Sequence, residues 1–234
     1  MLTDRQFNVL LDDFSLPYEN GTSKLYDYQK YIINDWKKHP YNALINARQT
    51  GSTTMIVVGS ILDSLLNDGR NVIIFNKQSQ AINIIKLIEK ILDVNDIDPQ
   101  LITPSSIMLY QASSISTSCI IHDYNLQGHI LNNIYVMDFD KIDHIENILH
   151  MVQPQMSSEV YPKIILQSTP YKRTGGISEY IKNPQFHTTV VNYNVIKNHD
   201  YNYYNFINHM KYIIGDESFA QEFDMTPHIN DIMK

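Results

Sequence analysis

Short apolar runs alternate with amphipathic segments along most of this chain, and this alternation limits the folds that it can adopt. The runs are rich in consecutive Val, Ile and Leu, which is typical of strands buried on both faces of a sheet. They lie at residues 43–46, 71–75, 134–137, 164–166 and 188–193. Apolar residues at helical spacing predict helices at 25–36, 52–66, 82–92, 142–151, 177–181 and 201–214. Strands that alternate with helices form a mainly parallel sheet covered on both faces, so we predict one α/β domain with three layers.

The remaining segments give weaker signals. Residues 4–14 predict a short amphipathic helix, and a loop is expected through residues 17–23. Residues 101–122 show no helical spacing, and we expect one or two edge strands there. The last predicted helix ends at Gly215, because glycine is frequent just after the end of a helix.

The composition is that of a globular protein. Of the 234 residues, 43% are hydrophobic and 18% are charged. The 18 basic and 25 acidic side chains give a formal net charge of −7, which argues against a permanent DNA-coating protein but allows transient DNA contacts. No stretch reaches the roughly 18 uninterrupted apolar residues of a membrane span. The single cysteine, Cys119, excludes an intramolecular disulfide framework, and a reducing intracellular compartment is expected.

The segment from Asn46 to Thr54 joins the first predicted core strand to its helix. Open α/β sheets bind ligands at the carboxyl ends of their strands, and a helix N-terminus there attracts phosphate. The segment partly fits the phosphate-loop pattern G-x-x-x-x-G-K-[ST], with Gly51 as the second glycine and Thr53 as the magnesium-binding hydroxyl. Asn46 replaces the first glycine and Ser52 replaces the lysine. By pattern alone, a turn at Gly51 with Ser52 or Thr53 capping the helix is the more frequent explanation.

Further motifs give this loop a context. They are L-Y-D-Y-Q at 25–29, A-R-Q-T-G-S-T-T at 47–54, N-K-Q-S-Q-A at 76–81, I-Y-V-M-D at 134–138, Q-S-T-P at 167–170 and S-F-A-Q-E-F at 218–223. In order and spacing, the sequence over about 25–225 resembles the N-terminal ATPase domain of the large terminase subunit, the DNA-packaging motor of tailed bacteriophages. The resemblance implies a P-loop NTPase fold of the RecA-like type, with ATP and Mg²⁺ as ligands.

The resemblance also assigns roles to individual residues. Gln29 matches the family's adenine-contacting glutamine, although an exposed helix amide is the alternative. Arg48 matches an arginine regarded as a cis-acting finger or sensor, and an ordinary surface salt bridge is equally expected. Thr53 and Asp138 match the magnesium-binding residues, and Asp138 also takes a catalytic role. The implied nucleotide-binding set is Gln29, Arg48, Gln49, Thr50, Gly51, Ser52, Thr53 and Thr54, and the implied coupling residues are Ser168 and Thr169.

Two parts of this site depart from the family. The lysine position is Ser52, whose hydroxyl can donate one neutral hydrogen bond but cannot reach a γ-phosphate. The family places two adjacent acids after its third strand. Here Met137 and Asp138, or Asp138 and Phe139, take those positions, so one acid is missing in either alignment. Asp140 substitutes for it if the strand continues, because residues two apart share a face. A solvated strand end nevertheless explains this acidic stretch better than a metal cluster does.

A missing lysine removes a charge-assisted hydrogen bond worth about 1.5–3 kcal/mol, and phosphoryl transfer is catalysed by such charge stabilisation. We therefore expect a terminase-type ATPase domain at 25–225 whose hydrolysis is weak or lost, and which serves as a binding, regulatory or structural module. Residues 1–24 form an N-terminal segment and 226–234 a polar tail, and no nuclease domain is expected. The expected partners are a motor subunit, the portal and transiently DNA, in the host cytoplasm and without a membrane. The sequence is compatible with an oligomer.

Three other hypotheses stay open. The chain is an active packaging ATPase if a cation from another loop or subunit replaces the lysine. The candidates for that cation are Lys77, Lys141, Lys172 and Arg173. It is a helicase-like P-loop protein if the tyrosine and glutamine at 28–29 belong to that class, although no D-E-x-[HD] run is present. It is a structural protein if nucleotide does not stabilise it against heat.

Overall fold

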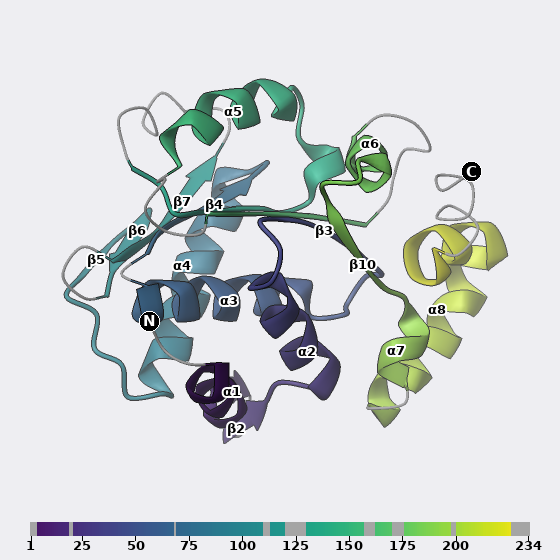
Figure 1. Cartoon of the computed structure of the whole chain (residues 1–234). Coiled ribbons are helices and arrows are strands. Elements are labelled where there is room, and N and C mark those ends of the chain that lie inside the picture. Colours follow the sequence, from purple (N-terminus) through teal and green to yellow (C-terminus); the bar gives the residue numbers. More distant parts are fainter. Residues whose placement is uncertain are drawn as a thin grey trace.

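An eight-stranded sheet forms the middle layer of the protein (Figure 1). The computed structural model describes residues 4–18, 21–67, 69–109, 113–119, 130–156, 162–169, 176–197 and 200–225. The strands of the sheet are β3 (Tyr41–Asn46), β4 (Arg70–Phe75), β5 (Leu101–Thr103), β6 (Ser106–Met108), β7 (Ser114–Cys119), β8 (Asn133–Val136), β9 (Lys163–Ser168) and β10 (His187–Val191). Their order is β10-β3-β9-β8-β4-β7-β6-β5. All neighbouring pairs from β10 to β7 are parallel, and β6 and β5 are added antiparallel.

Helices cover both faces of this sheet, as the sequence predicts. In Figure 1, α1 to α4 lie on one face, α5 and α6 lie on the other, and α7 and α8 lie beyond the edge strand β10. The helices are α1 (Asp4–Asp13), α2 (Asp27–Trp36), α3 (Ser52–Asn67), α4 (Gln78–Asp93), α5 (Ile145–Val152), α6 (Ile177–Lys182), α7 (Tyr193–Lys197) and α8 (Tyr201–Phe219). Short turns of helix are η2 (Phe139–Lys141), η3 (Gln153–Gln155) and η4 (Ala220–Asp224), the last a π-helix. The predicted three-layer α/β fold is therefore confirmed.

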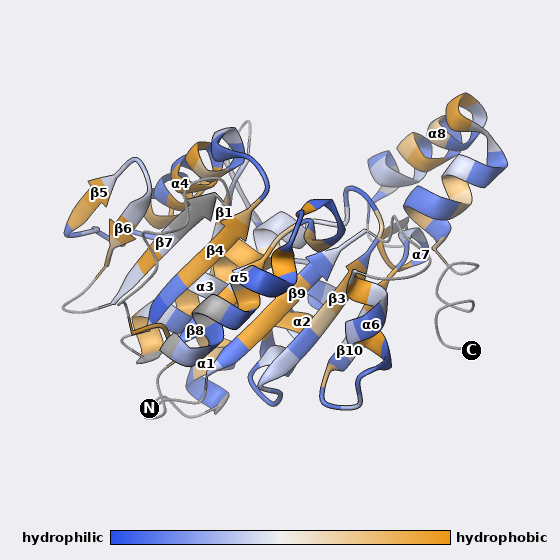
Figure 2. Cartoon of the chain, turned by 90° about the horizontal axis from the view of Figure 1, so that it is seen from above, coloured by the Kyte–Doolittle hydropathy of each residue, from blue (hydrophilic) through white to orange (hydrophobic). Residues whose placement is uncertain are grey.

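Alternate residues of each strand pack on opposite faces of the sheet, which explains the continuous apolar runs. In β4, Ile73 belongs to the hydrophobic cluster beneath α1 to α4, whereas Ile74 belongs to the cluster beneath α5 and α6. Leu44 and Ile45 of β3 divide in the same way. Figure 2 shows these strands as mainly hydrophobic, with α8 extending from the side of the molecule that carries β10.

Two segments differ from the sequence-based prediction because long-range contacts decide their structure. Where a loop was expected through residues 17–23, β1 (Ser15–Tyr18) and β2 (Gly21–Lys24) pair as an antiparallel hairpin. Asn95, just beyond α4, binds both backbone groups of Ser15 at 2.8 Å and so docks the hairpin. The described residues of the region 101–122 hold three strands rather than one or two, and β7 pairs with β4 instead of forming an edge.

The predicted helix end at Gly215 is confirmed, but a second helical segment that the sequence did not predict follows it. Gly215 has non-helical angles (φ 78°, ψ 165°), but the chain resumes helical geometry and continues to Phe219 and η4. Aromatic packing accounts for the continuation, because Phe219 and Phe223 stack with ring centroids 5.3 Å apart and pack with Tyr203 and Ile207. Within the described ranges, none of the helices combines the length and apolar character needed to cross a membrane.

Candidate functional site

The loop between β3 and α3 lies at the carboxyl edge of the sheet, where the sequence predicts a ligand site. Ala47 continues the sheet, since its N–H donates to the carbonyl of Val191 at 2.8 Å. The Thr50 hydroxyl donates to the Ala47 carbonyl at 2.9 Å, and the Tyr28 hydroxyl donates to the Thr50 carbonyl at 2.7 Å. These bonds fix the loop just ahead of the first turn of α3, whose N–H groups have no partner within the helix.

Gly51 is required by the way that the loop meets α2. Its φ of 72° lies in the left-handed region that favours glycine. A Cβ at this position would lie 2.3 Å from Nε2 of Gln29, so the amide of Gln29 occupies the space that a side chain would need. Gln29 is only 4% exposed, and its Oε1 accepts a hydrogen bond from the Tyr26 N–H at 3.0 Å. It is therefore not an exposed helix amide, and the sequence-predicted proximity of Gln29 to the loop is present.

A relay of buried side-chain amides connects the loop to the end of β8. Asn46 Nδ2 donates to the hydroxyls of Thr50 at 3.1 Å and Ser52 at 3.2 Å. Gln167 Nε2 donates to Asn46 Oδ1 at 2.7 Å, and Gln167 Oε1 accepts from the N–H of Asp138 at 3.0 Å. The relay forms because β9, which carries Gln167, lies between β3 and β8 in the sheet. Sequence reasoning noted Asn46 only as a missing glycine and Gln167 only as part of a motif.

Asp138 lies two residues after the end of β8, and a cation that binds its carboxylate must compete with other side chains. Its φ of 54° and ψ of 43° are left-handed. Its Oδ1 forms an ion pair with Lys141 at 2.9 Å, and its Oδ2 accepts from Gln80 Nε2 at 3.4 Å. Lys141, one of the candidate replacement cations, therefore contacts the carboxylate that the resemblance assigns to magnesium.

The residues after Asp138 do not supply a second acid at this position. The left-handed turn at Asp138 ends the strand, so the condition under which Asp140 replaces the missing acid is not met. Asp140 is buried, and its Oδ1 accepts from the N–H of Ile177 at the start of α6 at 2.8 Å. Phe139 is fully buried among apolar side chains.

Arg48 is held by the C-terminal part of the chain. Its Nε forms an ion pair with Glu222 Oε2 in η4, and its backbone N–H donates to the Glu222 carbonyl at 3.0 Å. The Tyr203 hydroxyl donates to the Arg48 carbonyl at 3.2 Å. The hydrogen bond that Arg48 donates to Glu222 raises the pKa of Arg48, against the opposing effect of burial. The structure thus shows the salt bridge, and a nucleotide-sensing role requires this pair to open.

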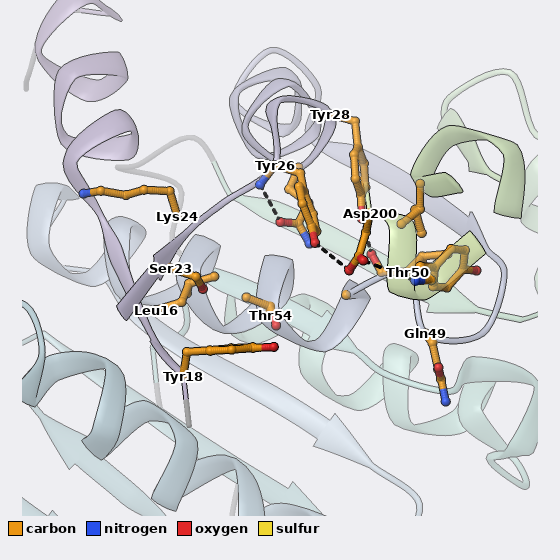
Figure 3. A pocket seen from close by; sticks show the side chains of 14 residues that line it. Leu16, Tyr18, Ser23, Lys24, Tyr26, Tyr28, Gln49, Thr50, Thr54 and Asp200 are labelled. Carbon is orange, nitrogen blue, oxygen red and sulfur yellow. Dashed lines mark hydrogen bonds between the residues drawn. The ribbon is translucent and has the colours of Figure 1, made fainter. Parts of the chain in front are cut away.

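A cavity of about 540 Å³ opens beside the loop (Figure 3). Its volume falls within the roughly 300–1,000 Å³ range of small-molecule sites. The hairpin, the start of α2, the loop, α7 and α8 contribute its walls. The lining residues are Leu16, Tyr18, Ser23, Lys24, Tyr26, Tyr28, Gln29, Gln49, Thr50, Gly51, Thr54, Ile196, Asp200 and Tyr203.

Aromatic rings and neutral hydroxyls dominate one side of this cavity. Tyr26 and Tyr28 stack with ring centroids 5.8 Å apart, and the Tyr26 hydroxyl donates to Asp200 Oδ2 at 3.0 Å. Burial raises the pKa of Tyr26, with Asp200 adding to the effect, and burial also raises the pKa values of Tyr28 and Tyr203. These phenols therefore stay neutral at physiological pH, which suits a flat, uncharged group. Sequence reasoning missed the hairpin and Asp200, because no local pattern links them to the loop.

The other predicted residues lie around this centre. Thr53 is half-buried in the first turn of α3. The Ser168 hydroxyl accepts from the N–H of Asp140 at 3.3 Å and donates to the Thr169 carbonyl at 3.3 Å, so both coupling residues lie at the end of β9 next to the relay. Lys77 is exposed just before α4. Two further candidate cations, Lys172 and Arg173, lie outside the described residues.

Known structures resemble this chain in fold, whereas the sequence comparisons find no match. The sequence matches no family model and no curated protein. Among solved structures, the large terminase ATPase domain of Thermus phage P74-26 matches with a TM-score of 0.68 and 15% identity, over 86% of this chain and 93% of that domain. The chain has the fold of a phage large terminase ATPase domain.

Two longer terminases give the same result. The large terminase of bacteriophage HK97 matches with a TM-score of 0.62 and 16% identity, over 81% of this chain and 44% of that protein. The large terminase of a thermophilic bacteriophage, in complex with ADP, matches with a TM-score of 0.63 and 7% identity, over 84% of this chain and 52% of that protein. The chain thus spans about half the length of these two proteins. The predicted terminase-type P-loop fold is confirmed.

Proposed function

We propose that this chain is a terminase-type ATPase domain that acts in viral DNA packaging and that hydrolyses ATP weakly or not at all. The observation that carries the proposal is the loop between β3 and α3, which opens onto the cavity of about 540 Å³ in a fold shared with terminase ATPase domains. The proposed partners are a motor subunit, the portal and transiently DNA, and the proposed place of action is the host cytoplasm.

In this proposal, the cavity holds the base and the N-terminus of α3 holds the phosphates of ATP. The stacked rings of Tyr26 and Tyr28 supply apolar faces, and the buried amide of Gln29 supplies polar groups beside Gly51. Backbone N–H groups at the start of a helix bind phosphate without a side-chain charge. The ADP complex of the thermophilic phage terminase is a case of a protein with this fold that binds a nucleotide, which supports the proposal for this chain.

The residues around Asp138 fit a hydrated magnesium ion. Mg²⁺ binds through one or two carboxylates while keeping several waters. Asp138 offers the carboxylate, and Gln80 Oε1 is a buried oxygen that has no hydrogen-bond partner among the described residues. Thr53 supplies the hydroxyl that the phosphate-loop pattern assigns to magnesium. Bound Mg²⁺ would neutralise phosphate charge, and it must displace Lys141 from Asp138.

Three features argue that hydrolysis is weak. Ser52 carries no charge, and its hydroxyl accepts a hydrogen bond from Asn46. Glu222 neutralises Arg48, and buried Phe139 stands where an adjacent acid would activate water. Each feature removes charge from the position where phosphoryl transfer needs it. Nucleotide binding through backbone groups and the cavity does not depend on these charges.

Nucleotide titration by calorimetry, with and without Mg²⁺, tests the proposal together with a hydrolysis assay. We expect Mg²⁺-dependent ATP binding that Thr53→Ala and Asp138→Asn weaken, and turnover close to a buffer blank. Asp143→Asn is the matched control, because Asp143 is an exposed acid of the same segment. Absence of ATP binding would refute the nucleotide site. Sustained turnover that Thr53→Ala abolishes would refute the loss of hydrolysis and favour an active ATPase that uses another cation.

A further inference from the structure

A second cluster of ligand-type side chains lies at the opposite edge of the sheet from the loop. Asp35 belongs to the last turn of α2, His39 lies in the turn between α2 and β3, and His187 begins β10. One ligand atom from each residue, two imidazole nitrogens and one carboxylate oxygen, lies within 4.8 Å of the others. Three separate elements therefore bring two imidazoles and a carboxylate together at the amino ends of β3 and β10.

The two imidazoles lie face to face beside the carboxylate. The rings of His39 and His187 stack with centroids 3.9 Å apart and an angle of 9°. His187 Nε2 lies 2.6 Å from Asp35 Oδ2. Imidazole nitrogens together with a carboxylate oxygen are a ligand set that divalent transition metals such as zinc favour.

The distances suit an ion of the zinc class after small side-chain movements. Zinc binds imidazole nitrogen and carboxylate oxygen at about 2.0–2.2 Å in tetrahedral geometry, which separates its ligand atoms by about 3.3 Å. The ligand atoms of the cluster must therefore approach by at most about 1.5 Å, and the closest pair must move slightly apart.

The surroundings already contain the outer contacts that metal sites use. Lys38 Nζ binds Asp35 Oδ1 at 3.1 Å, which orients the carboxylate and leaves Oδ2 for the ion. Asn42 Nδ2 donates to the His39 carbonyl at 2.8 Å and fixes the turn that carries the imidazole. Asn42 is 1% exposed, and its Oδ1 is buried without a hydrogen-bond partner among the described residues.

We propose that Asp35, His39 and His187 form a binding site for a divalent transition metal of the zinc class, with water as the fourth ligand. The site is structural, because it joins the end of α2 and the start of β3 to the edge strand β10. β10 in turn contacts the loop, since the carbonyl of Val191 at its carboxyl end accepts from the N–H of Ala47. The proposal is independent of nucleotide binding, since the cluster and the loop lie at opposite ends of β3.

The full chain, stripped of metal with a chelator, is titrated with Co²⁺ and with Zn²⁺ while excess Mg²⁺ blocks carboxylate sites such as Asp138. We expect one ion per chain, a visible Co²⁺ absorption typical of tetrahedral nitrogen ligation, and a rise in Tm of about 5–10 °C at a hundredfold excess of Zn²⁺ over its Kd. His39→Ala and His187→Ala are each expected to weaken binding at least tenfold. His150→Ala is the control, because His150 is exposed on α5.

Each outcome decides the proposal. Binding that is unchanged in the His39 and His187 variants, or Co²⁺ absorption typical of octahedral oxygen ligation, overturns it. No binding by the wild-type chain overturns it equally. If a histidine variant fails to fold, the wild-type Co²⁺ spectrum and its displacement by Zn²⁺ decide alone. Failure of this experiment leaves the nucleotide proposal untouched, because that proposal is tested by ATP titration of different variants.

Discussion

Replacing Ser52 with lysine asks whether the loop is a phosphate site that lacks its cation. Ser52 is the half-buried first residue of α3, and its hydroxyl accepts from Asn46 Nδ2 at 3.2 Å. In Ser52→Lys this bond is lost, but Asn46 Nδ2 keeps the Ala47 carbonyl at 2.8 Å and the Thr50 hydroxyl at 3.1 Å as acceptors. No buried donor is left unpaired, so we expect the free energy of unfolding to change by less than about 1 kcal/mol.

The expected gain is in nucleotide affinity. A hydrogen bond from a lysine ammonium to a phosphate oxygen is worth about 1.5–3 kcal/mol, which corresponds to a roughly 10- to 150-fold lower Kd for Mg²⁺-ATP. Isothermal titration calorimetry measures this Kd directly. The gain should shrink as salt is raised, because the contact is electrostatic. A hydrolysis assay on the same samples then shows whether the restored charge also restores turnover.

Ser52→Met is the matched control, because methionine has a similar length and helix propensity but no charge. We expect it to bind ATP no more tightly than the wild-type chain does. If folded Ser52→Lys and Ser52→Met proteins bind ATP equally, the argument that this loop once paired a lysine with phosphate is refuted. If Ser52→Lys binds more tightly yet hydrolyses no faster, the missing acid after Asp138 is the remaining barrier.

Three further predictions follow from single contacts. In urea unfolding, Gly51→Ala should lower the free energy of unfolding by about 1 kcal/mol or more beyond the loss in Gly215→Ala. Both glycines have a positive φ, but only at Gly51 would a Cβ meet Gln29, and equal losses in the two variants would contradict this argument. Glu222→Gln releases the loop arginine, so ATP should bind more tightly while unfolding changes by less than about 1 kcal/mol; unchanged affinity would rule out the ion pair as a restraint. Burial raises the pKa of Asp35, but Lys38 and His187 outweigh this effect and lower it. Ionised Asp35 therefore stabilises the fold above its ordinary pKa, and this stabilisation is lost as pH falls through the lower pKa of the folded state. In the presence of a chelator, the free energy of unfolding of Asp35→Asn should therefore fall less steeply than that of the wild type below about pH 4. If the two proteins lose stability in parallel, the interaction of Asp35 with Lys38 and His187 is refuted.

The layers of this fold could be predicted from sequence because its strands are buried on both faces. Residues 71–75 and 164–166 are apolar at every or nearly every position, and the structure places β4 and β9 there. The loop could be located for the same reason, since it joins an apolar strand to an amphipathic helix. A glycine with positive φ inside that loop can also be predicted from the local sequence, and Gly51 has that conformation.

The contacts of the candidate site could not be predicted in this way, because they depend on strand order. Gln167 meets both Asn46 and Asp138 only because β9 is inserted between β3 and β8. Arg48 and Glu222 are 174 residues apart, and no local pattern reports their ion pair. The same reason hides the wall of the cavity that α8 supplies.

The amide relay explains how this site can lose its charges without losing its shape. Asn46 and Gln167 find their donors and acceptors inside the protein, so they hold the loop and the turn at Asp138 in place without a ligand. A lysine at position 52 or a second acid after Asp138 would have no such internal partner, and charges at functional sites are commonly retained at a cost in stability. Their absence leaves every bond of the relay in place, including the one that Ser52 accepts from Asn46. Stability therefore favours keeping the relay, whereas only hydrolysis favours keeping the charges. A chain that needs the fold but not ATP turnover is expected to retain the relay and to lose the charges.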